Sequence, residues 1–246
     1  MVLLLSLVLL PLALVDSPVQ AKTPKKINLT VFGAASLTEV LPRLGEAFQL
    51  KNPNVKFTFS FAGSATLAQQ IVSGAPADLF FAAGSAPMTT AQNAKALMSQ
   101  PHNFASNSLV IVVPGDNPAA IRNLADFGKP GVKFLLCTPQ VPCGSAATKV
   151  LALAKILAQP VSLENDVKSV LTKVGLGEAD AGLVYRTDKS RTVTQIDFPE
   201  SRYAINKYPV AIVAGSKQAR IDNAFINFVL SQPGQAILRK AGFGKP

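Results

Sequence analysis

Short apolar runs alternate along the chain with longer segments in which apolar positions recur every three or four residues. The apolar runs are bounded by Gly, Pro or Asp, which is typical of buried strands, and they cover 27–35, 55–62, 77–83, 108–113, 132–138, 181–185 and 209–214. The longer segments predict helices at 37–50, 66–74, 86–97, 119–127, 145–158, 164–174 and 217–241. This alternation predicts an α/β fold with mostly parallel sheets that helices cover on both faces.

The first 21 residues differ from the rest of the chain. They contain the apolar run "VLLLSLVLLPLALV", and the small residues Val19 and Ala21 stand before Lys22. This arrangement predicts a secretory signal peptide over residues 1–21 and export to the periplasm or the cell surface. The run lacks basic residues before it, so an uncleaved membrane anchor is the alternative, although roughly 14 apolar residues are short for a bilayer span.

Composition and charge narrow the class of protein. With 246 residues and 48% hydrophobic content, the chain can bury a sizeable core as one large domain or as two lobes. Its formal net charge is +10, but the basic residues are scattered singly except in "KTPKK". Because no helix-turn-helix signature or pattern of interleaved basic and aromatic residues is present, a solvated surface or an anionic ligand explains the charge better than nucleic acid does.

Three strand-to-helix turns share one chemistry. "GAASLTE" (33–39), "AGSATLA" (62–68) and "PCGSAAT" (142–148) each place small residues and a hydroxyl at a helix start, without a basic residue. A capping box of Ser36 and Glu39 would explain the first turn by itself. Ligands of open α/β sheets bind beyond the carboxyl ends of strands, where helix N-termini offer unpaired N–H groups. Three such turns therefore predict an anion site built from neutral donors.

Several of these segments also resemble one protein family. The chain is similar, from Ile27 to its end, to the periplasmic molybdate-binding proteins, which are the substrate-binding components of ATP-driven importers. The segments that carry the resemblance are, in order, "VFGAASLTEVL", "FAGSATLAQQIVSGAPADLFFAA", "SNSLVIVVP", "VPCGSAA" and "ADAGLVYRTD".

The resemblance implies an architecture and a function. The expected fold has two α/β lobes joined by hinge strands, with residues 22–107 and 212–246 in the first lobe and residues 108–211 in the second. The lobes close on one tetrahedral dianion, molybdate and also tungstate, which is then passed to the membrane permease of an ABC importer. The expected protein is a monomer that needs no cofactor and has no enzymatic activity.

The resemblance also assigns the ligand-binding residues. The hydroxyls of Ser36 and Ser64, the backbone N–H groups of Cys143 and Val167, and the phenol of Tyr185 fall on the family's oxyanion donors. This set is chemically coherent, because a fully deprotonated oxyanion can only accept hydrogen bonds. Selection among dianions then rests on cavity size. A cavity that fits molybdate and tungstate should hold the smaller sulfate loosely. In one departure, Gly63 stands where the family often has Ser.

The two cysteines favour a disulfide. Cys137 and Cys143 are six positions apart in a chain that is expected to be exported, which is typical of a local disulfide bond. The alternative function is a hydrolase that uses Cys143 or Ser145 as nucleophile and His102, the single histidine, as base. We expect His102 to be a surface residue in a polar loop. One His and two Cys are too few for a four-ligand structural metal site.

Overall fold

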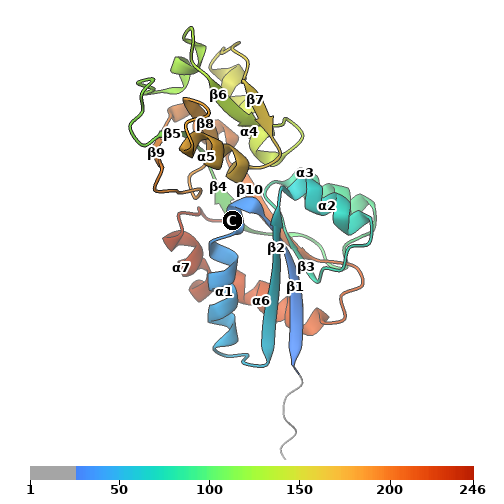
Figure 1. Ribbon diagram of the computed structural model, residues 1–246. Helices are drawn as coiled ribbons and strands as arrows, with labels where there is room; N and C mark the ends of the chain where they lie inside the picture. The colour runs from blue at the N-terminus through green and yellow to red at the C-terminus, as the bar shows by residue number, and fades with distance from the viewer. Residues whose placement is uncertain (1–25) are drawn as a thin grey trace, which may run out of the picture.

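The computed structural model describes residues 26–246 as two lobes, each built around a five-stranded sheet (Figure 1). The predicted signal peptide lies outside the described residues. The first sheet has the order β2-β1-β3-β10-β4 and the second has the order β7-β6-β8-β5-β9. The strands are β1 (Ile27–Ala34), β2 (Val55–Ala62), β3 (Leu79–Phe81), β4 (His102–Asn107), β5 (Leu109–Pro114), β6 (Phe134–Cys137), β7 (Ser162–Glu164), β8 (Ala181–Tyr185), β9 (Val193–Ile196) and β10 (Asn206–Ile212).

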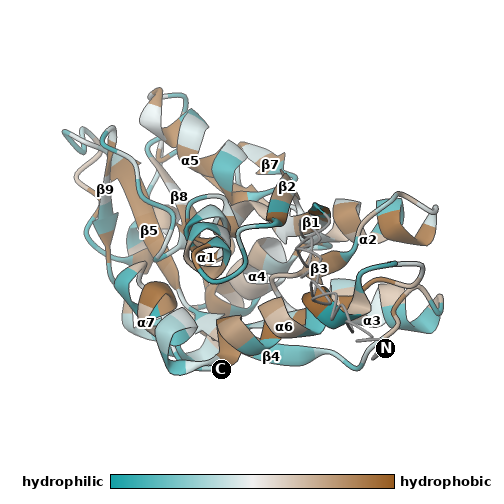
Figure 2. Ribbon diagram, turned by 90° about the horizontal axis from the view of Figure 1, so that it is seen from below, coloured by the Kyte–Doolittle hydropathy of each residue, from teal (hydrophilic) through white to brown (hydrophobic). Residues whose placement is uncertain are grey.

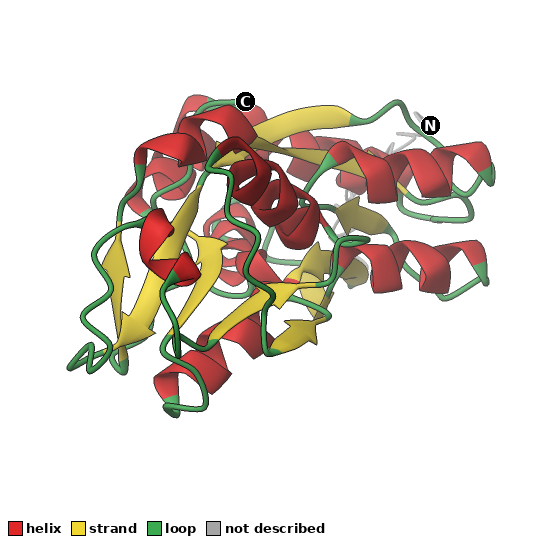
Figure 3. Cartoon of the chain, turned by 90° about the horizontal axis from the view of Figure 1, so that it is seen from above, coloured by secondary structure: helices red, strands yellow, loops and turns green. Residues whose placement is uncertain are grey.

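Helices flank the strands of both lobes (Figure 3). The α-helices are α1 (Val40–Gln49), α2 (Ser64–Val72), α3 (Ser85–Asn93), α4 (Pro142–Leu153), α5 (Val167–Gly175), α6 (Ala219–Leu230) and α7 (Gln232–Lys240). The 3-10 helices are η1 (Ala35–Leu37), η2 (Leu124–Gly128) and η3 (Pro199–Ala204). None of the described helices is both long and apolar enough to span a membrane.

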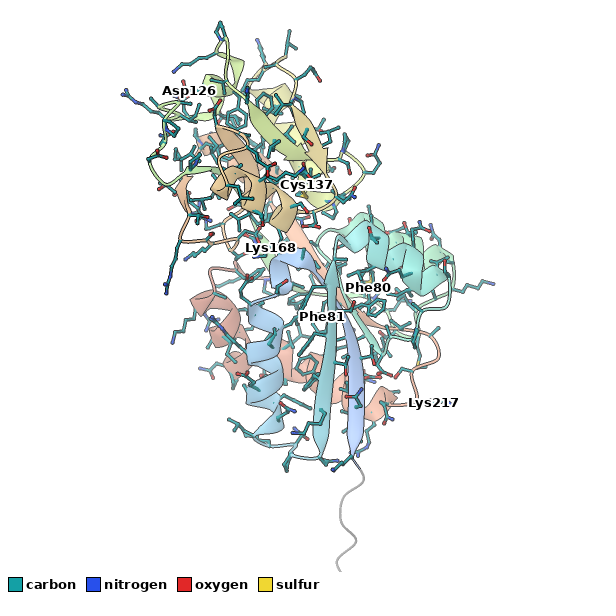
Figure 4. The ribbon with its side chains drawn as sticks, in the orientation of Figure 1. Phe80, Phe81, Asp126, Cys137, Lys168 and Lys217 are labelled. Atoms are coloured by element: carbon teal, nitrogen blue, oxygen red, sulfur yellow. A yellow bond between two sulfur atoms is a disulfide. The ribbon has the colours of Figure 1, made fainter. Side chains whose placement is uncertain are left out.

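The first sheet is buried on both faces. Successive side chains of a strand point to opposite faces, so Phe80 and Phe81 of β3 enter different clusters (Figure 4). Phe80 packs with Leu67 of α2, while the Phe81 ring lies 5.9 Å from the Phe225 ring of α6. Figure 1 shows α2 and α3 on one side of this sheet and α1, α6 and α7 on the other. The upper ends of β1 and β2 lie beneath the second lobe (Figure 1).

Both sheets are mixed, with fewer parallel pairs than the sequence predicts. The pairings of β1 with β2 and β3, and of β6 with β7 and β8, are parallel. Those of β10 with β3 and β4, and of β5 with β8 and β9, are antiparallel. The α/β fold with two lobes is confirmed. The antiparallel pairs arise where the chain passes from one lobe to the other.

The chain crosses between the lobes after β4 and again before β10. The first crossing falls at Asn107, since β4 belongs to the first sheet and β5 to the second. The second differs from the expected crossing near Ile212, because β10 already pairs with β3 and β4 of the first sheet. We therefore call residues 26–107 and 206–246 the first lobe and residues 108–205 the second lobe. Local pattern shows that a strand forms, but not which sheet it joins.

Three strands were not predicted, and the reason is their polarity or length. The sequence of β4, "HNFASN", is largely polar, and the strand is drawn hydrophilic where β5 and β8 are hydrophobic (Figure 2). Strands β7 and β9 have three and four residues. The segment 119–127 forms only η2, and the long helix predicted at 217–241 is divided into α6 and α7 at Ser231.

Candidate functional site

A small cavity lies between the two lobes and collects all five residues that the resemblance assigns to the ligand. Ser36, Ser64, Cys143, Val167 and Tyr185 all line it, although they come from five different elements. The remaining lining residues are Ala34, Ala35, Gly63, Ala83, Val141, Pro142, Asn165 and Asp166. The cavity volume is about 20 Å³, so the site is small.

Ser64 starts α2 with its hydroxyl turned toward the cavity. Its side chain is buried, and its Oγ accepts a hydrogen bond from the backbone N–H of Ala83 at 2.9 Å. A hydroxyl that accepts through one lone pair still carries its own proton to donate. The Ser64 hydroxyl is therefore available as a donor, and it does not cap its helix, whose N-cap is Gly63.

The capping box predicted for Ser36 and Glu39 is wrong. Neither η1 nor α1 has a side-chain cap, and Glu39 is itself the N-cap residue of α1. The Ser36 Oγ lies 2.9 Å from the phenol oxygen of Tyr208. Glu39 instead forms an ion pair with Lys168 across the gap between the lobes, with 2.8 Å between Nζ and Oε1. A tertiary contact replaces the local one because both partners lie at the lobe interface.

The predicted disulfide between Cys137 and Cys143 is confirmed and shapes the start of α4. It joins the end of β6 to the second residue of the helix, with 5.7 Å between the Cα atoms. A side chain at Gly144 would collide with the carbonyl oxygens of Thr138 and Cys137, so this turn requires glycine. The N–H of Cys143 belongs to the first helical turn and has no partner within the helix.

The start of α5 leaves one backbone donor for the cavity. Asp166 is the N-cap residue, and its Oδ1 accepts from the N–H groups of Lys168 at 2.8 Å and Ser169 at 3.0 Å. These bonds occupy the N–H groups of two residues in the first turn. The N–H of Val167 is not one of the groups that Asp166 accepts from. The Asp166 carboxylate, although it lines the cavity, is thereby tied to its own helix.

Tyr185 supplies a phenol that remains protonated. Its side chain is 1% exposed, and burial, reinforced by Tyr208 and Asp188, raises its pKa well above the ordinary value. The phenol oxygen accepts a hydrogen bond from Nδ2 of Asn206 at 2.6 Å, where β10 begins. Because the acceptor side is filled, the O–H is left to donate.

The lobes are closed against each other around this cavity. Lys168 lies where the second lobe faces the first (Figure 4), and it pairs with Glu39 of the first lobe and Asp188 of the second. A Cβ at Gly63 would stand 2.5 Å from the carbonyl oxygen of Asn165 in the opposite lobe. Glycine at position 63 therefore permits this close approach.

Lys168 and Asp188 form a charged contact beside the site. Burial opposes the charge on Lys168, but Asp188 and Glu39 outweigh it and raise the lysine pKa. Burial raises the pKa of Asp188 to about 6, although Lys168 lies 3.3 Å away. Neither lysine nor arginine lines the cavity itself, so the donors toward a ligand there are neutral.

The structure does not assemble the residues of the hydrolase alternative. The sulfur of Cys143 is bonded to Cys137 and is no free nucleophile. Ser145 is exposed and lines a different cavity, while His102 is an exposed residue that begins β4 and lines neither. Among the described residues, no group of three or more His, Cys, Asp or Glu side chains could hold a metal ion.

Sequence reasoning missed the residues behind the donors. Tyr208 contacts Ser36, Asn107 contacts Tyr208, and Asn206 contacts Tyr185. Both asparagines stand where strands enter or leave the lobe crossings. A polar residue at the end of a strand beside a crossing was the only available signal.

Comparisons with known proteins agree with this architecture. Over residues 29–244 the sequence matches the family described as bacterial extracellular solute-binding protein. The molybdate-binding protein ModA of Mycobacterium tuberculosis is 41% identical over 222 residues, which cover 89% of this chain and 85% of that protein. ModA of Escherichia coli is 32% identical over 229 residues and 88% of each chain.

A solved structure supports the fold independently. The periplasmic molybdate-binding protein of Azotobacter vinelandii matches with a TM-score of 0.78 at 22% identity, over 89% of this chain and 99% of that one. With the family match over nearly the whole chain and the identity to ModA, these findings lead to one conclusion. The chain belongs to the bacterial extracellular solute-binding proteins, in the family of the molybdate-binding protein ModA.

Proposed function

We propose that this protein binds molybdate, and also tungstate, in the cavity between its lobes and delivers the ion to the permease of an ABC importer. The observation that carries the proposal is the convergence of Ser36, Ser64, Cys143, Val167 and Tyr185 on one compact cavity. A dianion there would be held by two serine hydroxyls, one phenol and two backbone N–H groups. The names of the relatives at 41% and 32% identity point to the same ligand.

The chemistry of the donors supports an oxyanion without protons. Each hydrogen bond to a charged acceptor contributes roughly 1.5–3 kcal/mol, and the helix starts at Cys143 and Val167 add a favourable dipole. A protonated oxyanion would bring an O–H against a set of donors with no acceptor opposite. Cavity size is then the property left to separate dianions, and we expect it to favour molybdate and tungstate over the smaller sulfate.

The proposal extends to location and assembly. We infer that residues 1–21 are a signal peptide and that the protein acts outside the cytoplasm, as its family does. We expect a monomer, because all five donors come from one chain and close around the cavity without a partner. Gel filtration with light scattering at micromolar concentration measures the mass, and a stable dimer would contradict this part.

Titration calorimetry tests the ligand. We expect one-to-one binding of molybdate and tungstate, much weaker binding of sulfate, and none of phosphate. Ser145→Ala is a suitable control, because Ser145 lies outside the cavity and was a candidate nucleophile of the hydrolase alternative. No heat from molybdate at micromolar protein would overturn the proposal, while hydrolysis of a model ester that Ser145→Ala abolishes would support the alternative.

A further inference from the structure

Tyr208 is a fully buried tyrosine behind the site rather than in it. It lies in β10, has 0% exposure and is not part of the cavity lining. Its phenol oxygen is 2.9 Å from Oγ of Ser36 and 3.4 Å from Nδ2 of Asn107. A tyrosine hydroxyl in an otherwise apolar strand center needs partners of this kind, and here one of them is a residue of the candidate site.

The orientation of the Asn107 amide determines which atom donates in its contact with Tyr208. Its Oδ1 accepts from the N–H of Ser108 at 3.0 Å, so its Nδ2 must be the atom that faces Tyr208 and Thr187. An amide nitrogen only donates. The phenol oxygen of Tyr208 therefore accepts from Asn107.

The contact between Tyr208 and Ser36 depends on where the Tyr208 hydroxyl places its proton. Either oxygen could donate across the 2.9 Å contact between Tyr208 and Ser36, but the buried Tyr208 hydroxyl needs an acceptor for its own proton, and Oγ of Ser36 is within reach. Burial raises the pKa of Tyr208, with Asp188 adding to the effect, so the phenol keeps this proton at neutral pH. Ser36 then accepts from Tyr208, and its own proton is directed elsewhere.

We propose that Tyr208 is a positioning residue for the anion site: its phenol donates to Ser36 and thereby commits the Ser36 proton to the ligand. The inference rests on the proposed function in so far as Ser36 binds an oxyanion. The same arrangement recurs at the other two hydroxyl donors, since Ser64 accepts from the N–H of Ala83 and Tyr185 from Asn206. In each case a protein donor fills the acceptor side of the hydroxyl, so the proton is left for the cavity.

This arrangement discriminates by protonation state as well as by charge. A serine hydroxyl without a fixed donor can rotate to accept from a ligand O–H, whereas one held by Tyr208 cannot. Asn107 stands at the first crossing between the lobes and also donates to Thr187 of the second lobe. The chain of hydrogen bonds from Asn107 through Tyr208 to Ser36 therefore begins where the lobes are joined. The orientation of Ser36 is thereby linked to the position of the lobes.

A double-mutant cycle on the full exported chain tests the proposal with molybdate as probe. Tyr208→Phe keeps the ring and should weaken molybdate binding about 5- to 10-fold, within the range of a lost hydrogen bond. In a Ser36→Ala background, the same change should alter the affinity less than about twofold, because its effect passes through the Ser36 hydroxyl. Tyr203→Phe, at a half-exposed tyrosine on η3, is the matched control and should change nothing. Equal losses in both backgrounds, or no loss in either, would overturn the proposal.

A ligand-free measurement separates this inference from the proposed function. In proton NMR with labelled tyrosine, we expect the buried Tyr208 hydroxyl proton to exchange slowly with water in the unsubstituted protein and much faster in Ser36→Ala, which removes its acceptor. An unchanged exchange rate in Ser36→Ala would show that Tyr208 does not donate to Ser36. Because neither sample needs a Tyr208 substitution or a ligand, the result stands even if Tyr208→Phe does not fold or molybdate does not bind.

Discussion

The two lobes line the cavity with different kinds of proposed donor. The first lobe contributes the side-chain hydroxyls of Ser36 and Ser64, while the second contributes backbone N–H groups at Cys143 and Val167 together with the Tyr185 phenol. A hydroxyl can be removed by one substitution, but a backbone N–H survives a change of its own side chain. Binding through the first lobe should therefore be sensitive to side-chain identity, whereas binding through the second lobe should depend mainly on the position of its backbone.

The largest effect is expected from removing a hydroxyl of the first lobe. Ser64→Ala should weaken molybdate binding about 10- to 100-fold, equivalent to roughly 1.5–3 kcal/mol, because it deletes a hydrogen bond to a charged ligand. Calorimetry gives the affinity. Ser60→Ala on the exposed side of β2 is the control, and it should bind like the unsubstituted protein. Equal affinities for Ser64→Ala and Ser60→Ala would remove Ser64 from the site.

In the second lobe, the disulfide should matter for stability more than for affinity. Replacing both cysteines by alanine in Cys137→Ala/Cys143→Ala should lower the free energy of unfolding by about 2 kcal/mol, the chain-entropy value for so short a loop. Molybdate affinity should fall less than about threefold, since the N–H of residue 143 remains. Urea unfolding and calorimetry on the same samples give both quantities. A large loss of affinity without a loss of stability would contradict this prediction and would mean that the disulfide holds the N–H of residue 143 in place for the ligand.

Each lobe also contains a buried aspartate whose ionisation should make stability depend on pH. Asp222 of the first lobe has one carboxyl oxygen without a partner, and the other lies 2.6 Å from Oγ of Ser216. Burial raises its pKa to about 6 from 3.8. The folded state therefore binds the Asp222 proton more tightly than the unfolded state, so this contribution to stability is complete below about pH 4 and is lost as the pH rises to about 6.

Asp222→Asn should remove that dependence. We expect the free energy of unfolding to rise by roughly 1–2 kcal/mol above pH 6 and to change little below pH 4, because the neutral amide needs no ionisation. Urea unfolding at pH 4 and pH 8 measures the difference. Asp188→Asn in the second lobe should not show this rise in the free energy of unfolding, because Lys168 lies 3.3 Å from the Asp188 carboxylate and would lose its partner. Identical pH profiles for the two variants would erase this distinction between the lobes.

A methyl group between the lobes should have the smallest effect. Gly63→Ala would place its Cβ 2.5 Å from the carbonyl oxygen of Asn165, so the closed conformation should be disfavoured by about 1 kcal/mol and molybdate binding weakened about 3- to 10-fold. The folding stability of the first lobe should not change, because opening relieves the contact. Gly128→Ala, which has open space around its Cβ, is the control. Small-angle scattering should show a more open average shape for Gly63→Ala; unchanged affinity and shape would contradict the closure argument.

Much of the site could be predicted from sequence because its elements are local. The turns with small residues and hydroxyls at 33–39, 62–68 and 142–148 all reach the lobe interface, and the cysteine spacing was sufficient to predict the disulfide. Helix starts and short loops depend on residues a few positions apart, so pattern identifies them. The same reasoning failed for the Ser36 and Glu39 capping box, where both side chains found partners outside the turn.

Local patterning predicted an α/β chain with small residues and hydroxyls at its strand-to-helix turns, and the family resemblance predicted which residues gather there. Only the tertiary structure decided that β10 joins the first sheet and that Tyr208 reaches Ser36, a residue 172 positions away. It also placed an N–H donor against the Ser64 hydroxyl and another against the Tyr185 hydroxyl. The physical reason is that periodicity and capping act within a few residues, whereas strand pairing and hydrogen-bond direction depend on neighbours brought together only by folding.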